Sequence, residues 1–145
     1  MRIEKLLFVI AVGYLALPAG AQECTTQTLR GSYGYSVSGT IVTATGPLAP
    51  GPFAAVGRIT FDGRGGVQTV RSLSDNGNIL RNDAGSGNYT INDDCTGSFS
   101  ISVGPPQYAI TLTLDIVLDD TGQLRGVVTT PGVVLLLEGR RQLSM

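Results

Sequence analysis

A chain of 145 residues has room for one domain with its own core and is short for two. Ten basic and eleven acidic side chains give a net charge of −1, which excludes a broad cationic surface for nucleic acid. Tryptophan and histidine are both absent. The absence of histidine excludes an imidazole general base, a histidine metal ligand and the Ser–His–acid mechanism.

Residues 1–21 have the pattern of a secretory signal peptide. An apolar run over residues 6–17 follows a short basic start, Pro18 ends the run, and Ala19 to Ala21 are the small residues that a signal peptidase accepts. The run is shorter than the roughly 20 apolar residues of a permanent membrane helix. We therefore expect a domain over residues 22–145 that is exported, to the periplasm or the extracellular space, and keeps no stable membrane span.

Cys24 and Cys95 are the only two cysteines in the chain. An even pair in an exported protein most often forms a disulfide, and neither cysteine lies in a spaced cluster of metal ligands. By restricting the unfolded chain, a bridge between them would contribute about 4 kcal/mol to stability. The sequence therefore predicts a structural disulfide between Cys24 and Cys95.

The first half of the domain alternates apolar and polar residues, as strands with one buried face do. This pattern covers residues 31–37, 54–61 and 67–73. Residues 46–52 between the first two segments contain three prolines, which cannot donate the hydrogen bonds of an interior strand. We expect a stiff loop there, at one mouth of a barrel.

The second half repeats the alternation. Residues 87–91 and 96–103 are shorter candidate strands, and residues 108–118 form the longest one, with Tyr108 as the first of its inward-facing side chains. A strand of this length is typical of a tall barrel or sandwich wall. Residues 123–130 and 133–141 complete the series.

Turns rich in aspartate, asparagine and glycine separate these segments, at residues 62–66, 75–78, 92–94 and 119–122. Asp-Gly and Asn-Gly pairs tolerate left-handed backbone angles and therefore favour hairpins. About eight strands, each joined to the next in sequence, predict an all-β fold with a single antiparallel up-and-down β-barrel, whose closure removes exposed edges.

The acidic turns also suggest oxygen ligands for calcium, at Asp93 and Asp94 and at Asp119 and Asp120. Neither pair has the spaced pattern of a calcium loop with its distal glutamate, and turn formation already explains aspartate at these positions. We therefore predict no metal site and no cofactor, and assign no catalytic residue.

Aromatic residues are candidates for contact with a small apolar ligand. Tyr33, Tyr35, Phe99 and Tyr108 lie in the apolar positions of predicted strands, and tyrosine adds a polar group to an apolar body. The alternative is that these side chains pack into an ordinary core.

Glu138 is the fifth candidate for ligand contact. It follows the apolar run 133–137, and a carboxylate at the end of such a strand can point into a barrel and serve as an acid, a base or a ligand contact. The alternative is an ion pair with Arg140, two residues further along the same face, at the barrel rim.

Four stretches, residues 29–36, 51–65, 87–97 and 138–142, together resemble a group of small exported bacterial proteins of unassigned function, over nearly the whole domain. That group is in turn similar in architecture to calycin-like barrels such as the lipocalins and allene oxide cyclase. The resemblance implies an apolar barrel interior and a small lipophilic ligand. It transfers no catalytic residue, because fold analogy alone does not define a site.

The leading hypothesis is an exported, non-catalytic β-barrel protein that binds a small hydrophobic ligand, or a partner at the cell envelope. One alternative is a cofactor-free isomerase or cyclase of the allene oxide cyclase type, with Glu138 and a buried tyrosine in its site. A second is a structural or interaction domain of the cell envelope. The ligand, the oligomeric state, and whether the barrel interior is hollow or packed stay open at this stage.

Overall fold

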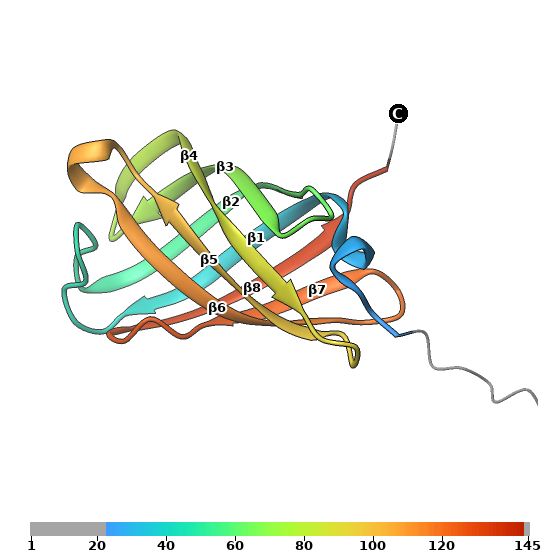
Figure 1. Cartoon of the computed structure of the whole chain (residues 1–145). Helices are drawn as coiled ribbons and strands as arrows, with labels where there is room; N and C mark the ends of the chain where they lie inside the picture. The colour runs from blue at the N-terminus through green and yellow to red at the C-terminus, as the bar shows by residue number, and fades with distance from the viewer. Residues whose placement is uncertain (1–22, 144–145) are drawn as a thin grey trace, which may run out of the picture.

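A computed structural model describes residues 23–143, and the strands of this part of the chain form one closed antiparallel β-barrel (Figure 1). Each strand pairs with its neighbours in sequence, and β8 pairs with β1 to complete the ring. The predicted up-and-down barrel is therefore confirmed. The predicted signal peptide, residues 1–21, lies outside the described residues.

In chain order the strands are β1 (Gly31–Ile41), β2 (Gly51–Phe61), β3 (Gly66–Asp75), β4 (Asn78–Ile91), β5 (Thr96–Val103), β6 (Ile110–Leu118), β7 (Gln123–Val128) and β8 (Val133–Arg141).

Two short 3-10 helices accompany the strands: η1 (Thr26–Leu29) precedes β1, and η2 (Pro106–Tyr108) lies between β5 and β6. The predicted strand over residues 108–118 is therefore wrong at its start. Pro105 and Pro106 set the backbone angles of this connection, so the strand begins only at Ile110. Tyr108 lies in η2 with 63% of its surface exposed, and it does not extend the buried face of β6.

The β2 strand also begins earlier than the sequence predicts. It starts at Gly51, so Pro52 belongs to the strand and lies opposite Thr40 of β1. A proline is tolerated near the start of this strand because the pairing of β2 with β3 begins only at Phe53, one residue later. Residues 42–50 are the remaining loop.

The β4 strand is the largest departure from the sequence prediction, which covered only residues 87–91. The strand has 14 residues. Its positions that face the barrel interior carry Asp83 and Gly87 instead of large apolar side chains, which hides the alternation. Gly87 is required there because a Cβ would collide with the carbonyl oxygen of Ser100 on β5. Asn82 adopts a φ of 55°, beside a register shift between β3 and β4.

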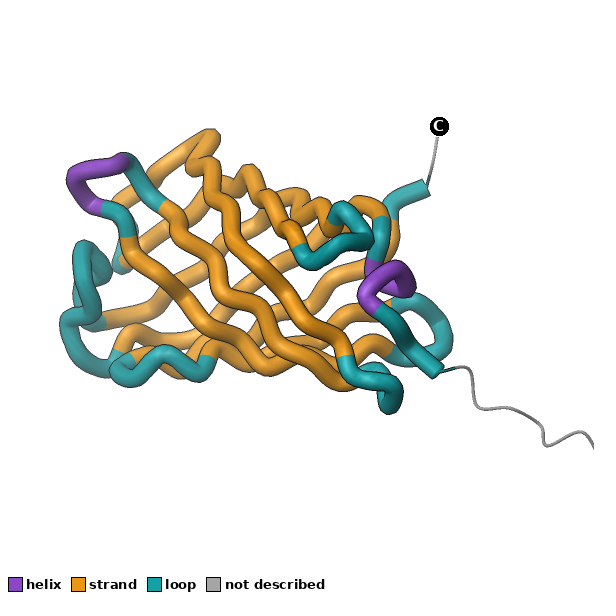
Figure 2. Tube along the Cα trace, in the orientation of Figure 1, coloured by secondary structure: helices purple, strands orange, loops and turns teal. Residues whose placement is uncertain are grey.

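Loops and turns gather at the two ends of the barrel (Figure 2). At the end on the left of Figure 1 lie loop 42–50, the β3–β4 turn, η2 and the β7–β8 turn; we refer to it as the open end. At the opposite end lie η1, the β2–β3, β4–β5 and β6–β7 turns and the end of β8; we refer to it as the closed end.

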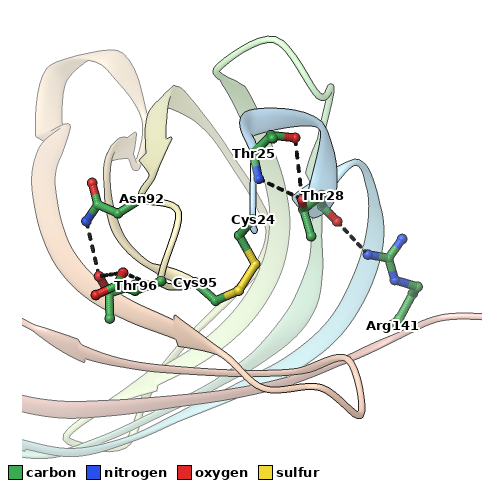
Figure 3. Close-up of a disulfide and its surroundings, with 8 residues drawn as sticks. Cys24, Thr25, Thr28, Asn92, Cys95, Thr96 and Arg141 are labelled. Carbon is green, nitrogen blue, oxygen red and sulfur yellow. Dashed lines mark hydrogen bonds between the residues drawn. A yellow bond between two sulfur atoms is a disulfide. The ribbon is translucent and has the colours of Figure 1, made fainter. Parts of the chain in front are cut away.

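The closed end is fastened by a disulfide between Cys24 and Cys95, whose Cα atoms are 5.1 Å apart, as predicted from the sequence. The bond joins the segment before η1 to the β4–β5 turn (Figure 3). Beside it, the Arg141 guanidinium donates to the carbonyl oxygens of Arg30 and Thr28 at 2.7 and 3.0 Å. These bonds hold η1 across the end of the barrel.

Aromatic side chains fill the interior beneath η1. The Phe61 ring meets the rings of Tyr33, Tyr89 and Phe99 edge-on, with centroid separations of 5.6, 5.0 and 6.0 Å. Edge-to-face contacts of this kind add to the free energy of burying the rings. The hydrophobic core therefore extends without a break to the closed end of the barrel.

Candidate functional site at the open end

The barrel interior is packed with its own side chains. The hollow between the strands has a volume of about 30 Å³, with Tyr35, Phe99 and Leu135 among its lining residues. A volume of that size holds about one water molecule. A ligand of drug-like or lipid-like size has no space there, so any site has to lie outside the centre of the barrel.

A larger pocket of about 280 Å³ lies at the open end. This volume is near the lower limit of typical small-molecule sites, which span roughly 300–1,000 Å³. Its lining is mostly apolar, with charged groups from β3 and β4 among the apolar side chains. The lining residues are Pro47, Leu48, Arg71, Leu73, Asp75, Asn78, Ile79, Leu80, Asp83, Val103, Gly104, Pro105, Tyr108 and Ile110.

An ion pair between β3 and β4 lies where this pocket meets the interior. Arg71 Nε donates to Asp83 Oδ2 at 3.0 Å, and the two side chains are only 7% and 3% exposed. The second oxygen of Asp83 accepts the backbone N–H of Gly104 at 2.9 Å. The Arg71 guanidinium also lies 5.9 Å from the centroid of the Phe53 ring. Both carboxylate oxygens of Asp83 are therefore satisfied by the chain itself.

Arg71 retains hydrogen-bonding capacity toward the pocket. Its side chain lines both the interior hollow and the pocket at the open end. Within residues 23–143 its one hydrogen bond runs from Nε, and neither terminal nitrogen is among the buried atoms that lack a partner. The terminal N–H groups therefore have no hydrogen-bond partner within the described residues, on a side chain that borders both spaces.

Asp75 is the last residue of β3, and only one of its two carboxylate oxygens accepts a hydrogen bond from the described residues. Its Oδ2 accepts the backbone N–H of Ala49 at 3.0 Å, which ties loop 42–50 to the barrel. Its Oδ1 is buried and has no hydrogen-bond partner in the described part of the chain. A buried acceptor without a partner is rare because desolvation costs about 1–3 kcal/mol or more for a charged group.

Tyr35 and Thr69 form a second buried polar contact, deeper in the barrel. Their hydroxyl oxygens are 2.8 Å apart, and the Thr69 hydroxyl donates to the Arg58 carbonyl at 3.1 Å. Because the Thr69 proton is used in that bond, Tyr35 is the donor in the contact with Thr69. Burial raises the pKa of Tyr35, with the Thr69 hydrogen bond acting in the opposite direction. Tyr35 therefore stays a neutral hydroxyl at ordinary pH.

The structure separates the aromatic candidates from one another. Tyr33 is fully buried at the closed end, where its hydroxyl accepts from Arg141 at 2.7 Å. Burial raises the pKa of Tyr33, and the nearby Arg141 charge partly opposes that effect. Tyr35 and Phe99 line the small interior hollow, and Tyr108 lines the pocket at the open end.

Glu138 lies on the outer face of β8 and is exposed, so the inward orientation that made it a candidate ligand contact is not found. The inward positions on either side belong to Leu137 and Gly139. The alternative, an ion pair with Arg140, does not form either: the salt bridges within residues 23–143 join Arg71 to Asp83, and an arginine to an aspartate at the closed end. Alternation counted from Val133 would have indicated the outward orientation.

The polar groups of the pocket, Arg71, Asp75 and Asp83, were not predicted from the sequence. A signal for two of them was present, since Arg71 and Asp75 share the inward parity of Val67 and Leu73 in β3. A charged residue at an apolar position of a strand marks either a buried pair or a site. Asp83 gave no such signal because the alternation of β4 is broken around it.

Comparisons with known proteins support the fold alone. No protein-family model matches this chain, and a search of curated proteins finds no match. Among solved structures the chain is similar to a redesigned β-barrel at 17% identity, with a TM-score of 0.58, covering 82% of this chain and 96% of that chain. The eight-strand antiparallel barrel is thereby supported, and the calycin-like assignment stays a prediction.

Neither of the helices within residues 23–143 has the length and apolar character needed to cross a membrane. The same part of the chain holds no group of three or more histidine, cysteine, aspartate or glutamate side chains that could bind a metal ion.

Proposed function

We propose that this protein is an exported, non-catalytic β-barrel that binds one small amphipathic molecule at its open end. The observation that carries the proposal is the pocket of about 280 Å³, whose lining combines apolar side chains with Arg71, whose terminal N–H groups have no partner in the described residues, and Asp75, whose Oδ1 is buried without one. Pockets that combine apolar walls with a few convergent polar groups are the usual form of a small-molecule site.

Export is supported by the signal-like sequence of residues 1–21 and by the disulfide. A bond between Cys24 and Cys95 persists in an oxidising compartment, such as the periplasm or the extracellular space, and is rare in the cytosol. Similarity in architecture to calycin-like barrels, which the sequence implies, agrees with a carrier or binding role. The proposed ligand position differs from that expectation, because it lies at the mouth and not inside the barrel.

Two features weigh against the isomerase or cyclase alternative. That hypothesis required Glu138 inside the barrel, and Glu138 is exposed on the outer face. It also required interior space for a substrate, whereas the hollow beside Tyr35 has only about 30 Å³.

The interaction-domain alternative is supported by apolar side chains on the outer face of β6, β7 and β8. Val117, Val127, Val134 and Leu136 are between 41% and 61% exposed. Sedimentation over a range of concentrations tests this role: concentration-dependent assembly that Leu136→Ser abolishes would favour it, and a strict monomer would exclude self-association through this face.

The test of ligand binding is titration of the purified protein with Nile red, an uncharged apolar dye, and with a matched pair of variants. Ile79 lines the pocket and is 58% exposed, while Leu136 lies on the outer wall and is 60% exposed. We expect saturable uptake of one dye per chain, weakened by Ile79→Glu and unchanged by Leu136→Glu. Absence of uptake, or equal weakening by both variants, would contradict the proposal.

A further inference from the structure

We infer that the pocket at the open end selects an amphiphile whose polar group donates hydrogen bonds and carries no negative charge, such as an alcohol or a protonated amine. This inference rests on the proposed function and names the chemical class of its ligand. It follows from three observations, two on the charged groups of the pocket and one on its apolar wall.

The first observation is the charge balance. The charged residues among the pocket lining described above are Arg71, Asp75 and Asp83, which is one guanidinium against two carboxylates. Arg71 and Asp83 form a direct buried pair, so the remaining charge of the site is the negative charge of Asp75. A carboxylate or phosphate ligand would enter a pocket of like charge with little water to screen it.

The second observation is the free oxygen. Asp75 Oδ1 is buried without a hydrogen-bond partner, while Oδ2 of the same carboxylate is held by the Ala49 N–H. Because Oδ2 is fixed by loop 42–50, the side chain cannot turn Oδ1 toward solvent without releasing that loop. No group of residues 23–143 donates to Oδ1, so the donor, an O–H or an N–H group, has to come from a water molecule or a ligand that reaches this buried oxygen beside the pocket.

The third observation is the arrangement of the apolar wall. Leu48, Leu73 and Ile110 line the same pocket as Asp75, and Ile79 and Tyr108 lie at its exposed side. An alkyl chain can contact these side chains while its polar end meets Oδ1. This arrangement matches an amphiphile better than a fully polar ligand such as a sugar.

The experiment compares octanol, octylammonium and octanoate at neutral pH, by calorimetry or by displacement of Nile red. The three probes share one chain and differ in the polar group. We expect octanol and octylammonium to bind wild-type protein about tenfold or more tightly than octanoate, since a hydrogen bond to a charged group is worth roughly 1.5–3 kcal/mol. Equal affinities would mean that a water molecule alone satisfies Oδ1, and stronger binding of octanoate would mean that Arg71 governs recognition; either result overturns the inference.

Asp75→Asn sharpens the comparison. An asparagine can keep its carbonyl oxygen on the Ala49 N–H and present its amide N–H₂ to the pocket, which exchanges an acceptor for a donor. We expect octylammonium to lose about tenfold in affinity and octanoate to gain, so that their order reverses. Asp120→Asn is the control, because Asp120 is exposed in the β6–β7 turn at the closed end and its substitution makes the same change in net charge.

The outcomes separate the two proposals. If none of the three probes binds, the proposed function fails together with the inference. If all bind and wild-type protein prefers octanoate, the ligand-binding function stands and the inference fails. A shift in preference that Asp120→Asn reproduces would also overturn it, because the effect would then belong to net charge and not to Asp75. Thermal melts of each variant ensure that only folded protein is compared.

Discussion

The two ends of this barrel use their polar groups in different ways. At the closed end, Arg141 reaches two carbonyl oxygens and the Tyr33 hydroxyl, and the disulfide joins Cys24 to the β4–β5 turn. At the open end, Arg71 and Asp75 each retain hydrogen-bonding capacity that the chain does not use. The chain uses its own polar groups to hold the closed end together, whereas the open end keeps the unused hydrogen-bonding groups on which the proposed ligand site depends. Four changes test this contrast, in order of decreasing effect.

Replacing an aromatic ring at each end should give the largest difference. Phe61→Ala removes the ring that contacts Tyr33, Tyr89 and Phe99, and we expect it to destabilise the protein by about 3–5 kcal/mol. Tyr108→Ala at the open end removes a ring that is 63% exposed and should cost about 1 kcal/mol or less. Urea denaturation of both variants measures the difference, and similar losses would show that the ends are equally packed.

Removing the disulfide should have the next largest effect. With Cys24→Ser and Cys95→Ser combined, we expect a loss of about 2–4 kcal/mol, because the bond restricts an unfolded chain over a sequence separation of 71 residues. The measurement is denaturation of wild-type protein with and without reductant, beside the double variant. Reduced wild-type protein should match the variant; an unchanged midpoint would mean that η1 is held by Arg141 without the bond.

Acid should weaken the closed end through its turns. Hydrogen bonds to the carboxylates lower the pKa of Asp62, Asp94 and Asp119 below the ordinary 3.8, chiefly from the Arg64 backbone N–H for Asp62 and from the Thr96 and Thr121 hydroxyls for the other two. A group whose folded-state pKa is depressed contributes stability that is present above the unfolded value, here about pH 4, and is lost as the pH falls through the lower folded values.

The measurement is the urea midpoint of wild-type protein between neutral pH and pH 2 or so, beside a triple variant with asparagine at these three positions. Asparagine can accept the same turn hydrogen bonds but does not titrate, so the variant should lose less stability in acid. A variant whose midpoint falls as steeply as that of the wild type would contradict a role for these carboxylates.

Trimming the rim of the pocket should have the smallest effect on stability. Ile79→Ser changes a side chain that is 58% exposed in β4, and we expect the free energy of unfolding to stay within about 0.5 kcal/mol. The same variant should weaken Nile red uptake if the open end is the binding site. A larger loss of stability would mean that Ile79 belongs to the core, and the functional contrast between the ends would be weaker.

Much of the barrel could be predicted from local patterns. Residues 96–103 alternate cleanly and residues 133–141 begin with a continuous apolar run, and the two segments match β5 and β8 at both ends. The predicted turns at 62–66 and 119–122 lie between β2 and β3 and between β6 and β7. β4 was predicted only in part, because Asp83 and glycines occupy its inward positions and the shift of register beside Asn82 interrupts the period.

The candidate site was predicted less well than the fold. Tyr108 was selected as a ligand contact and does line the pocket, although it was expected in a strand. Arg71 and Asp83 were missed because they are 12 residues apart in sequence and meet only through the pairing of β3 with β4. The free oxygen of Asp75 depends in turn on where loop 42–50 places Ala49.

By itself the sequence determined most of the strands, most of the turns and the pairing of Cys24 with Cys95, since alternation, left-handed turn residues and a lone cysteine pair are properties of short segments or of composition. Only the tertiary structure decided that the interior is full, that Glu138 faces outward and that a pocket lies at one end. Those features depend on side-chain volumes and strand registers around the whole ring, which no short segment contains.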